Sequence, residues 1–261
     1  MCLISFALNQ HPDYPLILIA NRDEFLNRPT APLHVWQDQS GIVGGRDNEA
    51  GGTWLAINKT GRWAALTNFR NPSEPPAEHS RGALVVDCLE SDLSLESWFK
   101  QMERNYTTGY AGYNFVAGEY NTEFSFYYSN VERKVRRLSN GHYAISNGRY
   151  DDDWPKMKYL REKLANQISG KDVEVDRLFE LLTHDQLAAQ DQLPNTGIPI
   201  EFEKRLSAPF IQPFKIMGRD YGTRSSAALV INKLGKVDFY ERTVIEENSS
   251  QTSESWSIKQ Q

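Results

Sequence analysis

Two apolar segments near the start of the chain constrain the fold most. Residues 2–8 and 15–20 read as β-strands, and a turn-rich segment with two prolines joins them into a hairpin. The second strand is apolar from Leu16 to Ile19, which is typical of a strand buried on both faces. It runs directly into the tetrad Asn21-Arg22-Asp23-Glu24. Charged residues at the end of a buried strand are costly unless they are paired, so the tetrad predicts a functional site or a salt-bridged corner.

The first strand begins with a cysteine. Aminopeptidases remove an initiator methionine when the next side chain is small, and we expect the mature chain to begin at Cys2. Cys2 would then carry a thiol and an α-amine, which are a nucleophile and a general base on one residue. Ordinary pKa values are about 8.5 for a thiol and about 7.7–8.0 for an α-amine, so the amine can accept the thiol proton near neutral pH. The alternative is that Cys2 packs as a small apolar side chain.

Composition excludes several classes of protein. The 261 residues carry a net charge of −5 from interspersed residues, and no long basic run is present, so we expect no nucleic-acid partner. No apolar stretch approaches the roughly 18 residues of a membrane span, and no signal-peptide pattern precedes the first strand. Two cysteines make no disulfide framework, and Cys88 lies in an apolar run that predicts core packing. We therefore expect a cytoplasmic protein without a membrane span.

The order of the expected elements is strands, a helix pair, strands, a second helix pair and strands. Two mostly antiparallel sheets stacked face to face, with helices outside each, accommodate this order without long crossovers. The sequence therefore predicts an α+β fold, a four-layer α/β/β/α sandwich, with residues 1–245 as one domain. Pro29, Pro32 and Gly41 mark an irregular stretch, and residues 186–213 are also expected to be irregular. The tail, residues 246–261, has low hydrophobicity and is expected to fray.

Polar residues also end two later strands. Asn68 follows the expected strand at 62–67, and Asn147 follows the expected strand at 142–146. With Arg22-Asp23, three separate strand ends carry an asparagine or an Arg-Asp pair. The alternative for Arg22-Asp23 is an ion pair at a corner of the sheet, and the repetition makes a functional site an equally good interpretation.

Short motifs along residues 1–231 carry a resemblance to a known family. In chain order they are Met1-Cys2-x-x-x-Phe6, Ala20-Asn21-Arg22-Asp23-Glu24-Phe25, Gly45-Arg46-Asp47, Gly51-Gly52-Thr53-Trp54-Leu55, Leu66-Thr67-Asn68-Phe69-Arg70, Ser80-Arg81-Gly82, Ser146-Asn147-Gly148 and Gly222-Thr223-Arg224. With these motifs the chain resembles the NRDE family, also called the transport and Golgi organisation protein 2 family. The resemblance implies no settled reaction, because eukaryotic members are associated with secretory-pathway organisation, haem traffic and lipid metabolism.

The same landmarks resemble, more distantly, the N-terminal-nucleophile hydrolases of the choloylglycine hydrolase and penicillin acylase group. Those enzymes have the α/β/β/α fold and cleave linear amide bonds with a mature N-terminal cysteine. Carried over residue by residue, the resemblance implies a set of catalytic candidates: Cys2 as nucleophile, Asn68 and Asn147 near the oxyanion hole, Arg22 and Asp23 beside the cysteine, and Arg224 late in the chain.

The chain departs from that group at the Arg-Asp pair. The group spaces the pair Arg-Asn-x-Asp, whereas Arg22 and Asp23 are adjacent here. Neighbouring residues of a strand point to opposite faces, so we expect one of the two to face Cys2, with Asn21 or Glu24 taking the other part. The candidate substrate-binding residues lie in the same motifs: Asn21, Glu24, Arg46, Thr53, Trp54 and Arg70.

Three functions are compatible with these residues. The first is an amidohydrolase in which Cys2 cleaves an amide or ester bond of a small-molecule substrate. The second is a carrier or chaperone of a hydrophobic ligand, such as haem or an acyl lipid, without chemistry. The third is a structural interaction protein without a pocket. No metal site and no cofactor are predicted, because the histidines show no i, i+4 pairing and Asp151-Asp152-Asp153 reads as a helix start. The oligomeric state stays open.

Overall fold

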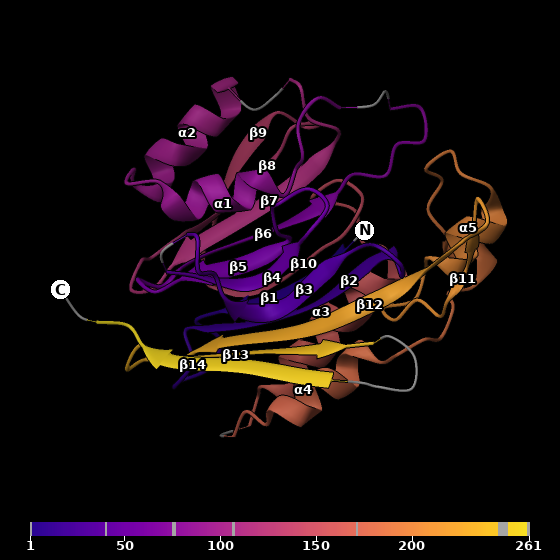
Figure 1. Ribbon diagram of the computed structural model, residues 1–261. Coiled ribbons are helices and arrows are strands. Elements are labelled where there is room, and N and C mark those ends of the chain that lie inside the picture. Colours follow the sequence, from indigo (N-terminus) through magenta and orange to yellow (C-terminus); the bar gives the residue numbers. More distant parts are fainter. Residues whose placement is uncertain are drawn as a thin grey trace.

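The computed structural model describes residues 2–39, 41–74, 77–105, 108–170, 172–244 and 250–259. Within these residues the chain forms two antiparallel sheets of seven strands each, which pack face to face (Figure 1). Helices cover the outer face of each sheet. The predicted α+β fold with four α/β/β/α layers is therefore confirmed.

The first sheet has the order β10-β1-β2-β12-β13-β14, with β11 paired to β12. Alternate residues of β1 (Cys2–Leu8) face different cores: Ile4 and Phe6 point to the second sheet, whereas Leu3 and Ala7 point to the helices. The strands of this sheet are β1 (Cys2–Leu8), β2 (Leu16–Phe25), β10 (Gly141–Ile145), β11 (Phe214–Ile216), β12 (Arg219–Ile231), β13 (Lys236–Thr243) and β14 (Ser250–Ser257).

The second sheet is a meander in chain order. Its inner face contributes Val43, Trp63 and Tyr127 to the core between the sheets. Its strands are β3 (Thr30–Val35), β4 (Ile42–Asp47), β5 (Leu55–Asn58), β6 (Arg62–Asn68), β7 (Tyr113–Glu119), β8 (Ser125–Ser129) and β9 (Lys134–Leu138).

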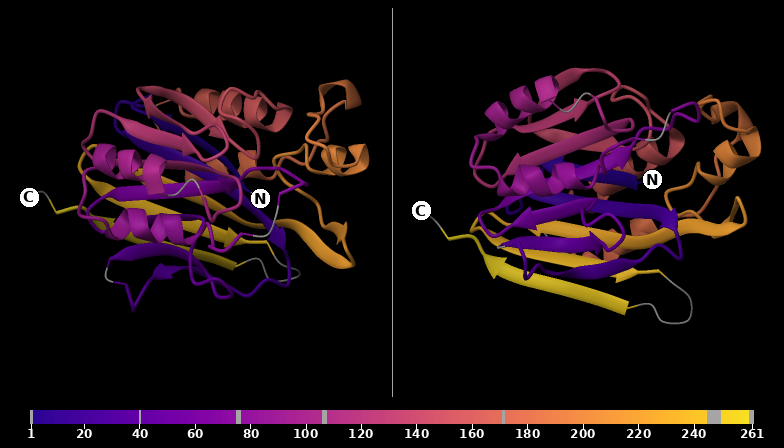
Figure 2. Two further views of the ribbon diagram at one scale, coloured as in Figure 1. Left: turned by 90° about the horizontal axis from the view of Figure 1, so that it is seen from above. Right: turned by 45° about the horizontal axis from the view of Figure 1, so that its top comes forward.

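Two helix pairs form the outer layers. The helices α1 (Ala83–Glu90) and α2 (Leu95–Asn105) pack on the second sheet, and α3 (Pro155–Gln167) and α4 (Val175–Leu182) pack on the first. A short helix, α5 (Ile200–Arg205), lies with β11 at one end of the sandwich (Figure 2). None of the helices in the described ranges is long and apolar enough to cross a membrane.

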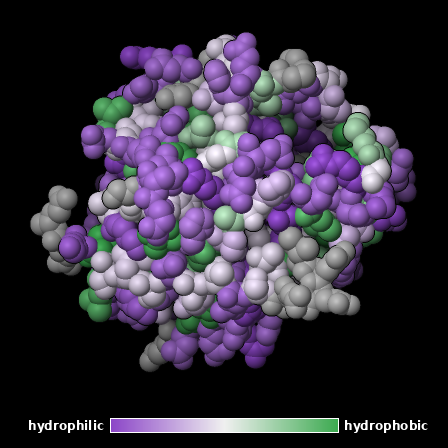
Figure 3. Space-filling view, viewed as in Figure 1, coloured by the Kyte–Doolittle hydropathy of each residue, from purple (hydrophilic) through white to green (hydrophobic). Residues whose placement is uncertain are grey.

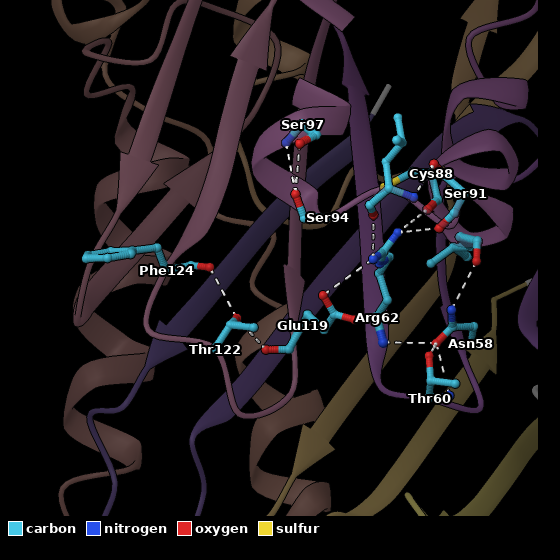
Figure 4. Close-up of polar contacts among 12 residues, drawn as sticks. Asn58, Thr60, Arg62, Cys88, Ser91, Ser94, Ser97, Glu119, Thr122 and Phe124 are labelled. Carbon is cyan, nitrogen blue, oxygen red and sulfur yellow. Dashed lines mark hydrogen bonds and ion pairs between the residues drawn. The ribbon is translucent and has the colours of Figure 1, made fainter. Parts of the chain in front are cut away.

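Arg62 ties the second sheet to the end of α1 (Figure 4). Its guanidinium donates to the carbonyl oxygens of Cys88 at 3.3 Å, Ser91 at 2.7 Å and Leu93 at 2.9 Å. It also lies 3.5 Å from the carboxylate of Glu119. The last carbonyls of a helix lack intrahelical donors, and a cation near them is favoured by the helix dipole. Arg62 therefore supplies the donors that the end of α1 lacks.

The structure corrects three expectations about irregular segments. The tail does not fray at residues 250–257, which form β14 at the edge of the first sheet, and Trp256 packs against the core there. The stretch marked by Pro29 and Pro32 contains β3, and residues 186–213 contain a 3₁₀-helix (Gln190–Gln192) and α5. The two strands were not recognised from the sequence because they contain prolines or many polar residues. Such residues are tolerated in β3 and β14, since both lie at sheet edges, where one side of a strand needs no partner. Residues 245–249, 260 and 261 lie outside the described residues.

Candidate active site

Cys2 is the first residue of β1 and points toward the second sheet. Its side chain is 7% exposed and belongs to the core between the two sheets. Burial raises the pKa of the Cys2 thiol, and Asp23 acts in the same direction, whereas Arg22 lowers it. The nearby arginine thus opposes part of the effect of burial on the thiol.

An open cavity of about 730 Å³ lies beside Cys2. Four parts of the chain form most of its walls: the end of β2, residues 47–54, the residues around the end of β6, and the segment 77–82 before α1. Seven of the predicted residues line it: Cys2, Arg22, Asp23, Glu24, Thr53, Trp54 and Asn68. Throughout the described ranges, no three His, Cys, Asp or Glu side chains come together in a way that could hold a metal ion.

The register of β1 and β2 separates the tetrad into two faces. Cys2 lies directly opposite Arg22, so their side chains share one face of the sheet. Glu24 follows on the same face, and Asn21 and Asp23 point to the other. The Asn21 amide donates to the carbonyl oxygen of Leu182 at 2.8 Å, which ties β2 to the end of α4. Among the described residues, Arg22 is therefore the register partner of the cysteine.

The guanidinium of Arg22 is held by contacts on several sides. It donates to Thr30 Oγ1 at 3.1 Å, lies 3.6 Å from Asp47 Oδ2 and stacks over the Trp54 ring at 4.1 Å. The Trp54 ring in turn lies against Gly45, where an added Cβ would approach the ring to 2.5 Å. A glycine is therefore required at position 45 for Trp54 to reach Arg22.

Two glycine-containing motifs meet at the cavity. An added Cβ at Gly52 would lie 2.4 Å from the carbonyl carbon of Gly82, so these two segments pack backbone against backbone. This contact places the neighbouring Arg81 on the cavity wall, where its side chain donates to the Gly112 carbonyl oxygen at 3.1 Å. Burial lowers the pKa of Arg81. Sequence reasoning did not name Arg81 as a site residue, although it lies within the Ser80-Arg81-Gly82 motif.

The two predicted asparagines are in contact but play different parts. Asn68 lines the cavity, whereas Asn147 is fully buried behind it. The Asn147 Nδ2 atom donates to the Asn68 carbonyl oxygen at 2.9 Å. The Ser146 hydroxyl lies 3.1 Å from Asn147 Oδ1 and 3.3 Å from the carbonyl oxygen of Cys2. The ends of β6 and β10 are thereby joined to the start of β1.

Two predicted arginines lie away from the cavity wall. Arg46 pairs with the carboxylate of Asp38 at 2.7 Å and stacks over the Trp36 ring at 4.2 Å. Arg224 lies at a register shift in β12 and donates to the carbonyl oxygen of Leu26, in the turn after β2. Both side chains are thus held by structural contacts.

A cluster of buried charges lies behind the cavity. Arg70 pairs with Glu203 of α5, and Lys156 of α3 lies 3.4 Å from Asn147 Oδ1. Burial lowers the pKa of Lys156 to about 8, Arg70 acts in the same direction, and Asp23 opposes them. Sequence reasoning missed Lys156 and Glu203, because a charged residue in a helix is usually exposed and no motif marks these two as buried.

A sequence model of one protein family, Transport and Golgi organisation 2, matches residues 1–246 of the chain. The chain belongs to this family. The Mus musculus protein named Transport and Golgi organization 2 homolog is 32% identical over 96% of this chain and 95% of its own length. The Homo sapiens Transport and Golgi organization protein 2 homolog is 30% identical, also over 96% and 95%.

Solved structures share the fold of this Transport and Golgi organisation 2 member. A variant of the conjugated bile acid hydrolase from Clostridium perfringens matches with a TM-score of 0.54 at 8% identity, over 98% of this chain and 97% of that one. The Caenorhabditis elegans ortholog of N-acylethanolamine-hydrolyzing acid amidase matches with a TM-score of 0.50 at 11% identity, over 88% and 92%. At these identities the likeness concerns the fold alone.

Proposed function

We propose that this chain is an N-terminal-nucleophile-type hydrolase in which Cys2 cleaves a linear amide or ester bond of a small-molecule substrate. One observation carries the proposal: Cys2 lines an open cavity and lies in register with Arg22 at the polar ends of β-strands. Cys88 provides the contrast within the chain, since it is fully buried between α1 and the second sheet.

The proposed reaction begins once Met1 is removed. The α-amine of Cys2 accepts the thiol proton, and the thiolate attacks the carbonyl carbon of the substrate. The tetrahedral intermediate collapses when the amine returns the proton to the leaving nitrogen or oxygen, which breaks the bond and leaves a thioester on Cys2. Water then attacks the thioester, the amine takes a proton from it, and the carboxylic acid leaves as the thiol is restored.

Asn68 is the proposed donor to the oxyanion, because its side chain is on the cavity wall. Loss of one such donor costs roughly 2.7–4 kcal/mol of transition-state stabilisation in a studied enzyme. Asn147 has a supporting part, since its side-chain amide donates to the Asn68 carbonyl oxygen. The proposed division is therefore one asparagine that faces the substrate and one that holds the first in place.

Charged residues complete the proposed catalytic set. Arg22 favours the thiolate, because a nearby guanidinium lowers the pKa of a thiol. Asp23 is proposed to orient the N-terminal amine, and Thr223 Oγ1 holds its carboxylate by a 2.7 Å hydrogen bond. Arg224 supports the turn after β2 through Leu26 and acts from outside the cavity wall.

The cavity wall supports a substrate with polar groups. Glu24, Thr53 and Trp54 stay the proposed substrate-binding residues, whereas Asn21, Arg46 and Arg70 make the structural contacts described above. Arg28, Glu74 and Arg81 add charge to the wall. The face of the molecule in Figure 3 is also mainly hydrophilic. These features favour a hydrolase of a polar amide over a carrier of a purely hydrophobic ligand.

A panel of N-acyl amides and esters tests the proposal, with release of the free acid as the readout. We expect the wild-type chain to hydrolyse members of the panel, Cys2→Ala to lose the activity, and the matched control Cys88→Ser to keep it. Hydrolysis that persists in Cys2→Ala would overturn the proposal. The carrier alternative instead predicts a saturable Soret shift with haem that Cys2→Ala leaves unchanged.

A further inference from the structure

Lys156, the second residue of α3, is 2% exposed. A lysine is rarely buried so deeply, because removing an ammonium group from water is costly unless it finds partners. In the part of the chain that the structure describes, its Nζ atom donates to Asn147 Oδ1 at 3.4 Å. The charges of Arg70, Asp23, Cys2 and Glu203 also act on it. This position joins the charge cluster to the asparagine behind the cavity.

The ammonium group determines which way the Asn147 amide faces. An ammonium has three donors and no acceptor, so it requires the oxygen of the amide and not the nitrogen. With Oδ1 toward Lys156, Nδ2 faces the carbonyl oxygen of Asn68 at 2.9 Å. The flipped amide would set its NH₂ group against the ammonium and its oxygen against a carbonyl. Both contacts would be repulsive, so Lys156 selects one orientation.

The selected orientation has consequences at the two residues proposed for the reaction. It holds the backbone at Asn68, whose side chain lines the cavity. It also keeps Asn147 Oδ1 within 3.1 Å of the Ser146 hydroxyl, which lies 3.3 Å from the Cys2 carbonyl oxygen. The chain of contacts therefore runs from α3 to the backbone of both Asn68 and Cys2.

We propose that Lys156 is a positioning residue for the Cys2 site. It holds the Asn147 amide in the orientation that supports Asn68 and Cys2. The inference rests on the proposed function in that it takes Cys2 as the reactive group. It names a part for a helix residue that does not line the substrate cavity.

A double-mutant cycle on the rate of Cys2 alkylation by iodoacetamide tests this inference, with peptide mass spectrometry to follow Cys2 alone. We expect Lys156→Met and Asn147→Ala each to change the rate by about tenfold at pH 7, and the double variant to match Asn147→Ala within about twofold. A further tenfold change on adding Lys156→Met to Asn147→Ala would overturn the inference, because Lys156 would then act on the thiol directly.

Two further variants separate a hydrogen bond from a general loss of structure. Lys158→Met removes an exposed lysine from the same helix and is expected to leave the rate unchanged. Lys156→Gln keeps a donor for Asn147 Oδ1 and is expected to stay within about threefold of the wild-type rate. Equal effects of Lys156→Gln and Lys156→Met would contradict the inference. Because alkylation needs no substrate, the cycle reads out the part of Lys156 even if no hydrolysis is found for the wild-type chain.

Discussion

Two buried arginines lie at opposite ends of one strand and are used differently. Arg62 begins β6, and Arg70 lies just beyond its end. The guanidinium of Arg62 reaches three backbone carbonyls and the Glu119 carboxylate, at distances of 2.7–3.5 Å. Arg70 pairs with Glu203, but its Nε and Nη2 atoms have no hydrogen-bond partner among the described residues.

The difference shows at which end of β6 a buried charge lacks hydrogen-bond partners. A buried charge that is well hydrogen-bonded costs the fold little, whereas a buried polar group without a partner carries a desolvation cost. The α1 end of β6 belongs to the first kind. The cavity end belongs to the second, because two nitrogen atoms of the buried Arg70 lack a hydrogen-bond partner among the described residues. Perturbed titratable groups of this kind cluster at functional sites.

The largest expected effect is at the α1 end and concerns stability alone. Arg62→Met removes three charged hydrogen bonds to carbonyl oxygens, and we expect unfolding in urea to lose about 4 kcal/mol of free energy. The rate of Cys2 alkylation in the folded protein should stay the same. A matched Lys100→Met change, at an exposed ion pair with Glu96, should cost less than about 1 kcal/mol. A lower rate of Cys2 alkylation in Arg62→Met would contradict this comparison between the two ends of β6.

The second expected effect is a pH-dependent stability at the cavity end. Glu241 is 3% exposed, accepts from the Leu33 backbone N–H at 3.0 Å, and has a pKa that burial raises from 4.5 to about 7. The folded state therefore binds the proton more tightly than the unfolded state, so stability is lost as the pH rises from 4.5 through about 7. Glu241→Gln should gain up to about 3 kcal/mol at pH 8 and little at pH 4.5.

Urea unfolding at the two pH values checks the Glu241→Gln prediction. The exposed acid Glu162 offers a control, because Glu162→Gln is expected to give the same small change at both pH values. A gain in Glu241→Gln that is equal at pH 4.5 and pH 8 would show that the carboxylate charge is not the cause.

The third prediction concerns the pKa of the Cys2 thiol. Arg22→Met removes the guanidinium opposite Cys2, and the pKa of the thiol is expected to rise as a result. We expect Cys2 alkylation at pH 7 to slow by about fivefold, which corresponds to about 1 kcal/mol of lost charge attraction. The pH–rate profile should move to higher pH. An unchanged profile would mean that Arg22 stabilises the fold without acting on the thiol.

The smallest expected effect is at Arg46, which the sequence placed in the site. Arg46 is held by Asp38 and Trp36 away from the cavity wall. Arg46→Gln should change the alkylation rate by less than about twofold and the unfolding free energy by less than about 0.5 kcal/mol. A larger loss of reactivity would show that Arg46 reaches the cavity in solution.

Much of the fold could be predicted because alternation and apolar runs report burial directly. The hairpin of residues 2–8 and 15–20, both helix pairs and the antiparallel sheets followed from such patterns. β14 could not be recognised, since an edge strand exposes most of its side chains and its sequence is polar. β3 was hidden by Pro32, which an edge strand tolerates.

The site was predictable where it lies at strand ends and obscure where it depends on packing. Asn68 and Asn147 were singled out from sequence, and the structure brings them into contact. Nothing in the sequence distinguishes Lys156 from the exposed Lys158 two residues later, because burial depends on how α3 packs on the sheet. Likewise, the adjacent Arg22 and Asp23 could be divided between faces only after the register with β1 was known.

The most direct test of the account is a mass map of the purified protein after reaction with a thiol-reactive probe at neutral pH. The account predicts an N-terminal peptide that lacks Met1 and carries the probe on Cys2, while Cys88 stays unlabelled in its fully buried position. Retention of Met1, or labelling of Cys88 ahead of Cys2, would contradict the claim that Cys2 is an N-terminal nucleophile.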